Sequence, residues 1–279
     1  MKKISSRANP SVKYALKLKT KKGRDRNNAF LAEGGILIEE AIKTGTTVRH
    51  VFLRDDSETS GEAEKILKEL PADTEILLLP SEIFNEIADA KTPQALMAVV
   101  EKPENVGFSA EALTSLADGE KGSLSVIVLD RIRDPGNTGS ILRTADAAGV
   151  TAAVLIKGTA DIFAPKVCRA AAGALFRLPV FYAEDAESVI EVFRNSGISL
   201  FALDMDGIPY YEAGLTGKTA FIVGNEGEGL QDVFIKTADA LFSVPMRENA
   251  ESLNAGVAAA VIMYEKLRQD RQQGEIYGN

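Results

Sequence analysis

Residues 124–148 read LSVIVLDRIRDPGNTGSILRTADAA. The first six of these residues are almost continuously apolar, as in a strand that is buried on both faces of a parallel sheet. A polar loop follows, in which Pro135 and Gly136 predict a turn. Asn137 is a good N-cap for a helix that extends to about Ala148. The order of strand, loop and helix predicts an α/β unit.

The same alternation of strands and helices continues towards the end of the chain. Further strands are predicted at 152–156, 180–181, 200–203, 220–223 and 240–244, and a last helix at about 253–269. A parallel sheet with helices on both faces accounts for this pattern. Ligands bind such sheets beyond the carboxyl ends of the strands, so attention falls on the loops at 130–137, 224–230 and 245–252.

The sequence before this unit has a smaller α/β pattern of its own. A short apolar run ends at residues 30–35, strands are predicted at 48–53, 76–79 and 95–100, and helices are predicted at 36–42, 61–70 and 81–89. Residues 103–123 contain Pro103, Gly107, Gly119 and Gly122, which is typical of a linker. We therefore predict four parts: a basic N-terminal arm at 1–26, a small α/β domain at 27–102, a linker at 103–123 and the larger domain at 124–270.

The composition is that of an ordinary globular protein, since 45% of the 279 residues are hydrophobic and 26% are charged. This excludes a disordered chain, and one cysteine excludes an intrachain disulfide. With His50 and Cys168 the only residues of their types, neither a protein-only zinc site nor a Ser-His-Asp hydrolase is expected. No apolar run approaches about 18 residues, so we expect a cytoplasmic protein without a membrane span.

The net charge of −8 conceals a strong asymmetry. Residues 1–26 carry ten basic side chains and one acidic side chain, whereas the rest of the chain carries 22 basic and 39 acidic side chains. A segment with a net charge of +9 predicts contact with a polyanion such as nucleic acid. The alternative is a positively charged first helix that is simply solvated.

Two of the three loops carry residues that point to a ligand. Arg143 lies among apolar residues of the first predicted helix, where an arginine usually pairs with a phosphate or a carboxylate. The alternative is an ion pair with Asp134 or Asp146.

The loop at 224–230 has three glycines that allow close backbone approach, but Glu226 and Glu228 would repel a pyrophosphate. A ligand with hydroxyls and a positive centre, such as S-adenosylmethionine, suits the loop better than a dinucleotide does, and a plain glycine-rich turn remains the alternative.

Two other features have simpler interpretations. Gly217-Lys218-Thr219 resembles the end of a P-loop, but it lacks the earlier glycine and precedes a strand, so a nucleoside triphosphatase is rejected. In the third loop, Ser252 is a candidate N-cap for the last helix. The small residues at 255–260 would let that helix approach another backbone closely, or would serve ordinary packing on the sheet.

Together, the three loops resemble the SpoU, or TrmH, family of RNA 2′-O-ribose methyltransferases. The matching segments are NTGSILRT at 137–144, IVGNEGEGL at 222–230, and Pro245-Met246 with ESLN at 251–254. The resemblance covers residues 124–268, and residues 5–10 and 30–34 resemble the family's N-terminal substrate-binding domain, which would bind RNA. It implies a parallel sheet with a C-terminal trefoil knot, a homodimer with the active site near the subunit interface, and S-adenosylmethionine as the cofactor.

The resemblance also implies roles for individual residues. The catalytic set is Asn137, Arg143, Glu226, Ser252 and Asn254. The cofactor contacts are Gly224, Asn225, Gly229, Val244, Met246 and Leu253. With the basic segment and the local arginines added, the candidate RNA contacts are Lys13, Lys21, Lys22, Arg24, Arg26, Arg131 and Arg133. No metal is expected. Arg143 would clamp an RNA phosphate and stabilise negative charge, and the alternative role is that of general base.

The predicted function is transfer of a methyl group to a ribose 2′-hydroxyl of structured RNA, with ribosomal RNA, of the 23S type, favoured over transfer RNA. The alternatives are a transfer-RNA 2′-O-methyltransferase and a non-catalytic RNA-binding protein of the same fold. A Rossmann dehydrogenase is disfavoured by the two glutamates of the glycine-rich loop. The chain departs from the family at Arg247-Glu248-Asn249, where glycine is common, which leaves the conformation of that loop open.

Overall fold

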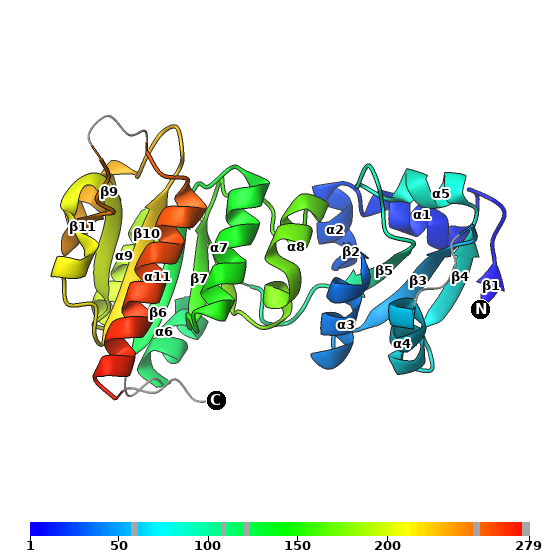
Figure 1. Cartoon of the computed structure of the whole chain (residues 1–279), viewed down its shortest axis with the longest axis horizontal. Helices are drawn as coiled ribbons and strands as arrows, with labels where there is room; N and C mark the ends of the chain where they lie inside the picture. Colours follow the sequence, from blue (N-terminus) through cyan, green and yellow to red (C-terminus); the bar gives the residue numbers. More distant parts are fainter. Residues whose placement is uncertain (57–60, 108–109, 120–122, 248–251, 275–279) are drawn as a thin grey trace. The chain divides into compact units, whose positions relative to one another are not determined.

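The computed structural model describes residues 1–56, 61–107, 110–119, 123–247 and 252–274, which form two compact units (Figure 1). Unit 1 consists of Met1–Glu104 and Asp161–Arg177, and unit 2 consists of Asn105–Ala160 and Leu178–Asn279. The segment 161–177, which the sequence pattern places in the larger domain, therefore groups with the first unit. The predicted linker contributes helix α6 (Ala110–Gly119) to unit 2.

Unit 1 is built on a five-stranded mixed sheet in the order β1-β4-β3-β5-β2. Strands β1 and β3 run parallel to β4, whereas β5 is antiparallel to β2 and β3. The strands are β1 (Lys2–Lys3), β2 (Ala29–Glu33), β3 (Val48–Arg54), β4 (Glu75–Leu79) and β5 (Leu96–Glu101). The helices are α1 (Pro10–Lys17), α2 (Lys21–Asn27), α3 (Gly35–Lys43), α4 (Gly61–Glu69), α5 (Ser81–Ile87) and α8 (Pro165–Ala171), followed by a 3-10 helix at Ala172–Phe176.

The basic segment at the N-terminus is folded into unit 1 and does not form a free arm. Asn9 and Thr20 cap α1 and α2, because each side chain accepts a hydrogen bond from a backbone N–H of the first turn. Val12, Ala15 and Leu18 are fully buried in the core of this unit. The lysines of this segment therefore lie on two helices. Helical structure was the expectation under the alternative of a positively charged first helix.

Segment 161–177 belongs to unit 1 because it packs against α2 and β2. The ring of Phe30 in β2 lies 5.0 Å from the ring of Phe163 and 6.1 Å from the ring of Phe176. Arg24 of α2 forms a buried ion pair with Asp161, with Nη2 at 2.6 Å from Oδ2. The prediction that Arg24 binds RNA is therefore wrong, since its guanidinium also donates to the carbonyl oxygens of Leu18 and Lys19 inside the unit.

Unit 2 confirms the predicted parallel sheet. Six strands lie in the order β11-β9-β10-β6-β7-β8, and all neighbouring strands are parallel. They are β6 (Leu124–Asp130), β7 (Ala152–Ile156), β8 (Val180–Ala183), β9 (Ser199–Pro209), β10 (Lys218–Gly224) and β11 (Ala240–Ser243). The remaining helices are α7 (Pro135–Ala147), α9 (Ala186–Asn195), α10 (Asp232–Thr237) and α11 (Ala255–Gln272), with a 3-10 helix at Tyr210–Glu212.

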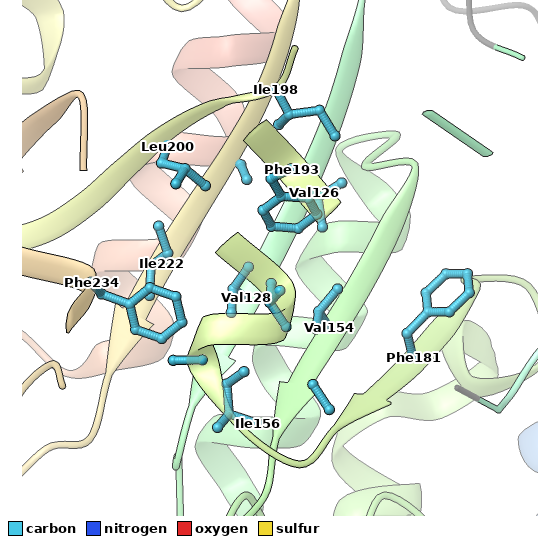
Figure 2. Packing of buried hydrophobic residues seen from close by; sticks show 14 of the residues in the cluster. Val126, Val128, Val154, Ile156, Phe181, Phe193, Ile198, Leu200, Ile222 and Phe234 are labelled. Atoms are coloured by element: carbon cyan, nitrogen blue, oxygen red, sulfur yellow. The ribbon is translucent and has the colours of Figure 1, made fainter. Parts of the chain in front are cut away.

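Helices cover this sheet on both faces. On one face, Val126, Val128 and Ile222 of the strands pack against Phe193 of α9 and Phe234 of α10 (Figure 2). On the other face, α7 and α11 lie side by side across the strands (Figure 1). Burial of alternate strand residues on opposite faces explains why β6 is apolar along nearly its whole length.

The topology places the loops after β6 and β10 next to each other. Chain order runs from β6 outward through β7 to β8, and then crosses to β9 on the other side of β10. The junction of β6 and β10 is therefore the switch point of the sheet, where ligands of open α/β sheets bind. In the register of the two strands, Asp130 pairs with Gly224, so both carboxyl ends open at the same level.

Candidate active site

Three side chains from three different loops form one hydrogen-bonded chain at this end of the sheet. The Nδ2 of Asn137, in the first turn of α7, donates to Oε1 of Glu226 at 2.5 Å. The Nδ2 of Asn254 donates to Oδ1 of Asn137 at 2.7 Å. Asn137 thus links the loop after β10 to the start of α11. These residues are three of the five members of the predicted catalytic set.

The position of Asn137 depends on a capping arrangement that differs from the predicted one. Asp134, not Asn137, is the N-cap of α7, and its Oδ1 accepts a hydrogen bond from the backbone N–H of Asn137 at 2.8 Å. Pro135 occupies the first helical position, which proline favours. The side chain of Asn137 is therefore released from capping and is able to bond to Glu226 and Asn254.

The start of α11 differs in a similar way. The predicted cap Ser252 lies before the helix, and Asn254 is the N-cap, with its Oδ1 accepting from the N–H groups of Gly256 at 2.9 Å and Val257 at 3.3 Å. Gly256 also allows close approach of α11 to α7, since a Cβ there would lie 2.7 Å from Oγ of Ser140. The small residues of α11 therefore bring its capped end to the site.

Arg143 and Ser252, the other two members of the predicted catalytic set, are both exposed. Arg143 lies on α7, six residues after Asn137, and its side chain faces solvent. Asp146, three residues further along α7, is partly buried, and burial raises its pKa. Ser252 and Leu253 are both exposed in the stretch before Asn254. Arg143 is thus placed to meet a ligand from solvent.

The glycine-rich loop at 224–230 is shaped by Gly224 and Asn225. A Cβ at Gly224 would lie 2.7 Å from the backbone atoms C of Gly229 and N of Leu230, so the loop closes directly over this glycine. The backbones of Asn225 and Gly229 pair with N···O distances of 3.1 and 2.9 Å. The buried Oδ1 of Asn225 accepts from the N–H groups of Gly227 and Glu228 at 2.9 and 3.0 Å. The side chain of Asn225 therefore holds the loop, and its predicted cofactor contact would be made through the backbone.

Two arginines neutralise one side of this loop. Arg131 donates to Asp130 at 2.9 Å and to Glu228 at 3.1 Å, and Arg133 pairs with Glu228 at 2.6 Å. Glu226 instead bonds to the neutral amide of Asn137. An exposed carboxylate that is satisfied by an amide retains its negative charge towards solvent, which favours a ligand with a positive centre.

Apolar side chains border the same loops. Met246 and Leu253 are about two-fifths exposed, at 38% and 40%, and Val244 is half-buried at the end of β11. These loops therefore offer apolar as well as polar side chains to a ligand. The chain departs from the family pattern at Arg247-Glu248-Asn249. Glu248 and Asn249 lie outside the part of the chain that the structure describes.

The other predicted positions lie in unit 1. Lys13, Lys21, Lys22 and Arg26 are exposed on α1 and α2, where they are accessible to a polyanion. His50 is part of β3, and burial lowers its pKa. In the described ranges of the chain, no cluster of three or more His, Cys, Asp or Glu residues could hold a metal ion, and no helix is long and apolar enough to cross a membrane.

Sequence reasoning missed Asp130, Asp134 and Gln231. The carboxylate of Asp130 is completely buried and accepts hydrogen bonds from the backbone N–H and the Nε2 of Gln231, both at 2.7 Å. A proline directly after Asp134 was the available signal for that cap. For Asp130 the signal was an acidic residue at the end of an otherwise apolar strand.

Comparison with known proteins yields two family matches that divide the chain. The SpoU rRNA methylase family matches residues 125–264, and the MRM3-like substrate binding domain matches residues 9–98. A Bacillus subtilis protein, the 23S rRNA (guanosine(2553)-2′-O)-methyltransferase RlmP, is 36% identical over 265 residues, which cover 95% of this chain and 98% of the relative.

Solved structures give the same picture. The SpoU methyltransferase AviRb from Streptomyces viridochromogenes, in complex with the cofactor AdoMet, aligns with a TM-score of 0.82 and 29% identity, and the alignment covers 94% of this chain and 98% of that one. An AdoMet-bound rRNA methyltransferase from Sinorhizobium meliloti aligns with a TM-score of 0.81 and 28% identity, over 95% and 97% of the two chains.

Proposed function

This chain belongs to the SpoU rRNA methylase family, and from its site we propose that it is an RNA ribose 2′-O-methyltransferase. It transfers a methyl group from S-adenosylmethionine to a ribose 2′-hydroxyl of structured RNA. The observation that carries the proposal is the hydrogen-bonded chain of Glu226, Asn137 and Asn254, which joins the three loops at the switch point of the sheet.

The residues present fit S-adenosylmethionine. The cofactor combines an apolar adenine face with a positive sulfonium, and the loops combine exposed apolar side chains with the carboxylate of Glu226. When bound, it supplies the methyl group as an electrophile. The residues that would hold it are Gly224, Asn225, Gly229, Val244, Met246 and Leu253.

The protein's own residues would act on the RNA. A neutral 2′-hydroxyl is a poor nucleophile, so its proton must leave as the new bond forms, or the developing alkoxide must be stabilised. Arg143 is exposed, and a guanidinium remains charged in proteins, so it would clamp an RNA phosphate and stabilise the negative charge. Asn137 and Glu226 would fix the geometry, while Ser252 and Asn254 would orient the acceptor ribose.

The substrate that we propose is ribosomal RNA of the 23S type. The relative from Bacillus subtilis is named for that RNA, and residues 9–98 match a substrate-binding domain. Exposed Lys13, Lys21, Lys22 and Arg26 of α1 and α2 provide positive charge for phosphate contacts. Arg133, which is 61% exposed, would add a contact near the cofactor loop.

We further propose a cytoplasmic homodimer whose C-terminal part forms a trefoil knot. Val257 and Tyr264 support the dimer, since they lie seven residues apart on one face of α11 and are about half exposed. Burial of this face against a second copy would place α7 and Arg143 near the subunit boundary. Sedimentation equilibrium is expected to give twice the monomer mass, and Val257→Glu is expected to give monomers.

Isothermal titration with S-adenosylmethionine tests the proposed function. The wild type is expected to bind, and Leu253→Arg is expected to lose binding because a charged chain replaces an exposed apolar cofactor contact. Arg143→Ala is expected to retain cofactor binding and to lose transfer of a labelled methyl group to RNA. A wild type that fails to bind the cofactor would contradict the proposal. Binding without transfer to any RNA would favour the non-catalytic alternative.

A further inference from the structure

Asp130 and Arg131, at the end of β6, are bonded to the glycine-rich loop more extensively than its other neighbours in the described structure. Asp130 is 0% exposed, and a buried carboxylate is tolerated only when its oxygens are fully hydrogen-bonded. It accepts from the backbone N–H of Gln231 at 2.7 Å, from Nε2 of Gln231 at 2.7 Å and from Nε of Arg131 at 2.9 Å. These bonds fix the point at which the loop ends and α10 begins.

Arg131 extends the same network along the loop. Its guanidinium donates to Oε2 of Glu228 at 3.1 Å and to the carbonyl oxygen of Gly229 at 3.3 Å. Its own carbonyl oxygen accepts from Nδ2 of Asn225 at 2.8 Å. Three positions of the loop are thus bonded to a single residue, in addition to the anchor at Gln231.

The backbone of Arg131 is constrained as well. Its φ is +57°, in the left-handed region that residues with a side chain rarely adopt. Such a conformation persists where the surroundings determine it, and these strained positions concentrate at functional sites. In this conformation the guanidinium of Arg131 lies against Asp130 and the loop. A contact with RNA would instead require the guanidinium to face solvent.

We infer that Asp130 and Arg131 are positioning residues that hold the loop at 224–230 in the conformation that binds S-adenosylmethionine. This inference rests on the proposed function and replaces the prediction that Arg131 contacts RNA. The loop carries Glu226, so its position also determines whether that carboxylate meets Asn137. Loss of the guanidinium should therefore affect cofactor affinity, whereas loss of the exposed Arg133 should affect RNA affinity.

The experiment compares Arg131→Met with Arg133→Met in the full-length protein. Methionine keeps an unbranched apolar chain of similar length and removes the charge-assisted hydrogen bonds. The dissociation constant for S-adenosylmethionine is measured by titration without RNA, and the KM for undermethylated ribosomal RNA is measured separately. Arg131→Met is expected to weaken cofactor binding about tenfold or more, with the KM for RNA within about twofold of the wild type. Arg133 reaches the loop only through an exposed ion pair with Glu228, which contributes little, so Arg133→Met is expected to keep the dissociation constant for S-adenosylmethionine within about twofold of the wild type and to raise the KM for RNA.

Two further variants keep the test decisive. Arg131→Lys keeps the positive charge and a hydrogen-bond donor, so it should bind S-adenosylmethionine more tightly than Arg131→Met does. A residue that only filled space would show no such recovery of cofactor affinity. If Arg131→Met is too unstable to study, Gln231→Leu removes only the Nε2 donor to Asp130 and should still weaken cofactor binding. Unchanged cofactor affinity in Arg131→Met, whether or not the KM for RNA rises, would overturn the inference. A wild type that binds no cofactor would instead overturn the proposed function.

Discussion

Asn254 performs two tasks with one amide side chain. Its Oδ1 caps α11, and its Nδ2 donates to Asn137. Aspartate caps helices as well as asparagine does but has no donor, so Asn254→Asp separates the two tasks. We expect unchanged thermal stability and a loss of methyl transfer of about tenfold or more. Asn254→Ala should lose activity and also about 1 kcal/mol of stability. Full activity of Asn254→Asp would show that the bond to Asn137 is dispensable.

A second residue-scale prediction concerns Ala172, which ends α8. Its φ is +49°, so its Cβ is strained by about 1–3 kcal/mol. Ala172→Gly relieves this strain and costs about 0.5–1 kcal/mol of chain entropy, so we expect a net stabilisation of about 1 kcal/mol in denaturant unfolding. The matched control is Ala171→Gly, because Ala171 is the preceding residue and is fully buried in the helix. This variant protein should lose about 1 kcal/mol or more of stability. Equal effects in both variants would contradict this explanation.

The identities of the site residues followed from a resemblance, but their contacts did not. Asn137 and Glu226 are 89 residues apart, and their bond depends on which residue caps α7. Asp134 and Asn137 are both good caps, and only the preference of Pro135 for the first helical position decides between them. Arg24 shows the same limit, because charge alone does not indicate that Asp161, 137 residues away, will pair with it.

At the scale of elements, the apolar strands were predictable and the basic helices were not. The runs that became β6, β7 and β10 are apolar along most of their length because both faces of that sheet are covered. Helices α1 and α2 are only eight and seven residues long, which is shorter than the stretch over which hydrophobic periodicity identifies a helix. The caps Asn9 and Thr20 were the stronger signals for these two helices.

The loop after β10 gives a prediction at the same scale. A methyl group at Gly224 would lie 2.7 Å from backbone atoms of Gly229 and Leu230, which cannot move without opening the loop. Gly224→Ala is therefore expected to cost about 1–3 kcal/mol and to abolish cofactor binding in titration calorimetry. Gly227→Ala is the control, because its Cβ would meet only Oδ1 of Asn225, at an ordinary 3.6 Å. Tight cofactor binding by Gly224→Ala would exclude the proposed role of this turn.

At the scale of the whole molecule, positive charge is concentrated in the first 26 residues. Most of these basic side chains are exposed and available to RNA, whereas Arg24 is buried in an ion pair. The protein carries −8 overall, yet its first 26 residues carry +9, and all of their basic residues except Arg24 are exposed. Local positive surface, and not net charge, is therefore what we expect RNA to meet. Unit 1 also depends on the later segment 161–177, which supplies the partner of Arg24.

Lys22 and Arg24 of α2 test whether exposed basic residues bind RNA while the buried one stabilises the fold. Lys22→Gln is expected to leave stability unchanged, to weaken RNA binding, and to reduce the slope of log affinity against log salt by about 1. Arg24→Met leaves the mostly covered Asp161, whose side chain is 12% exposed, without its ion-pair partner and is expected to cost about 3 kcal/mol in urea unfolding. Its RNA affinity under native conditions should be retained. An exchange of these two outcomes would refute the assignment of the cations.

We expect methyl transfer to ribose to depend on Arg143 and on the hydrogen-bonded chain of Glu226, Asn137 and Asn254. To test this, the protein is incubated with labelled S-adenosylmethionine and 23S rRNA from cells that lack its gene, and the 2′-O-methylated nucleotides are then mapped. We predict one labelled ribose with the wild type and none with Arg143→Ala, although this variant still binds the cofactor. Label on a base, or label on ribose at the wild-type level with Arg143→Ala, would contradict the account.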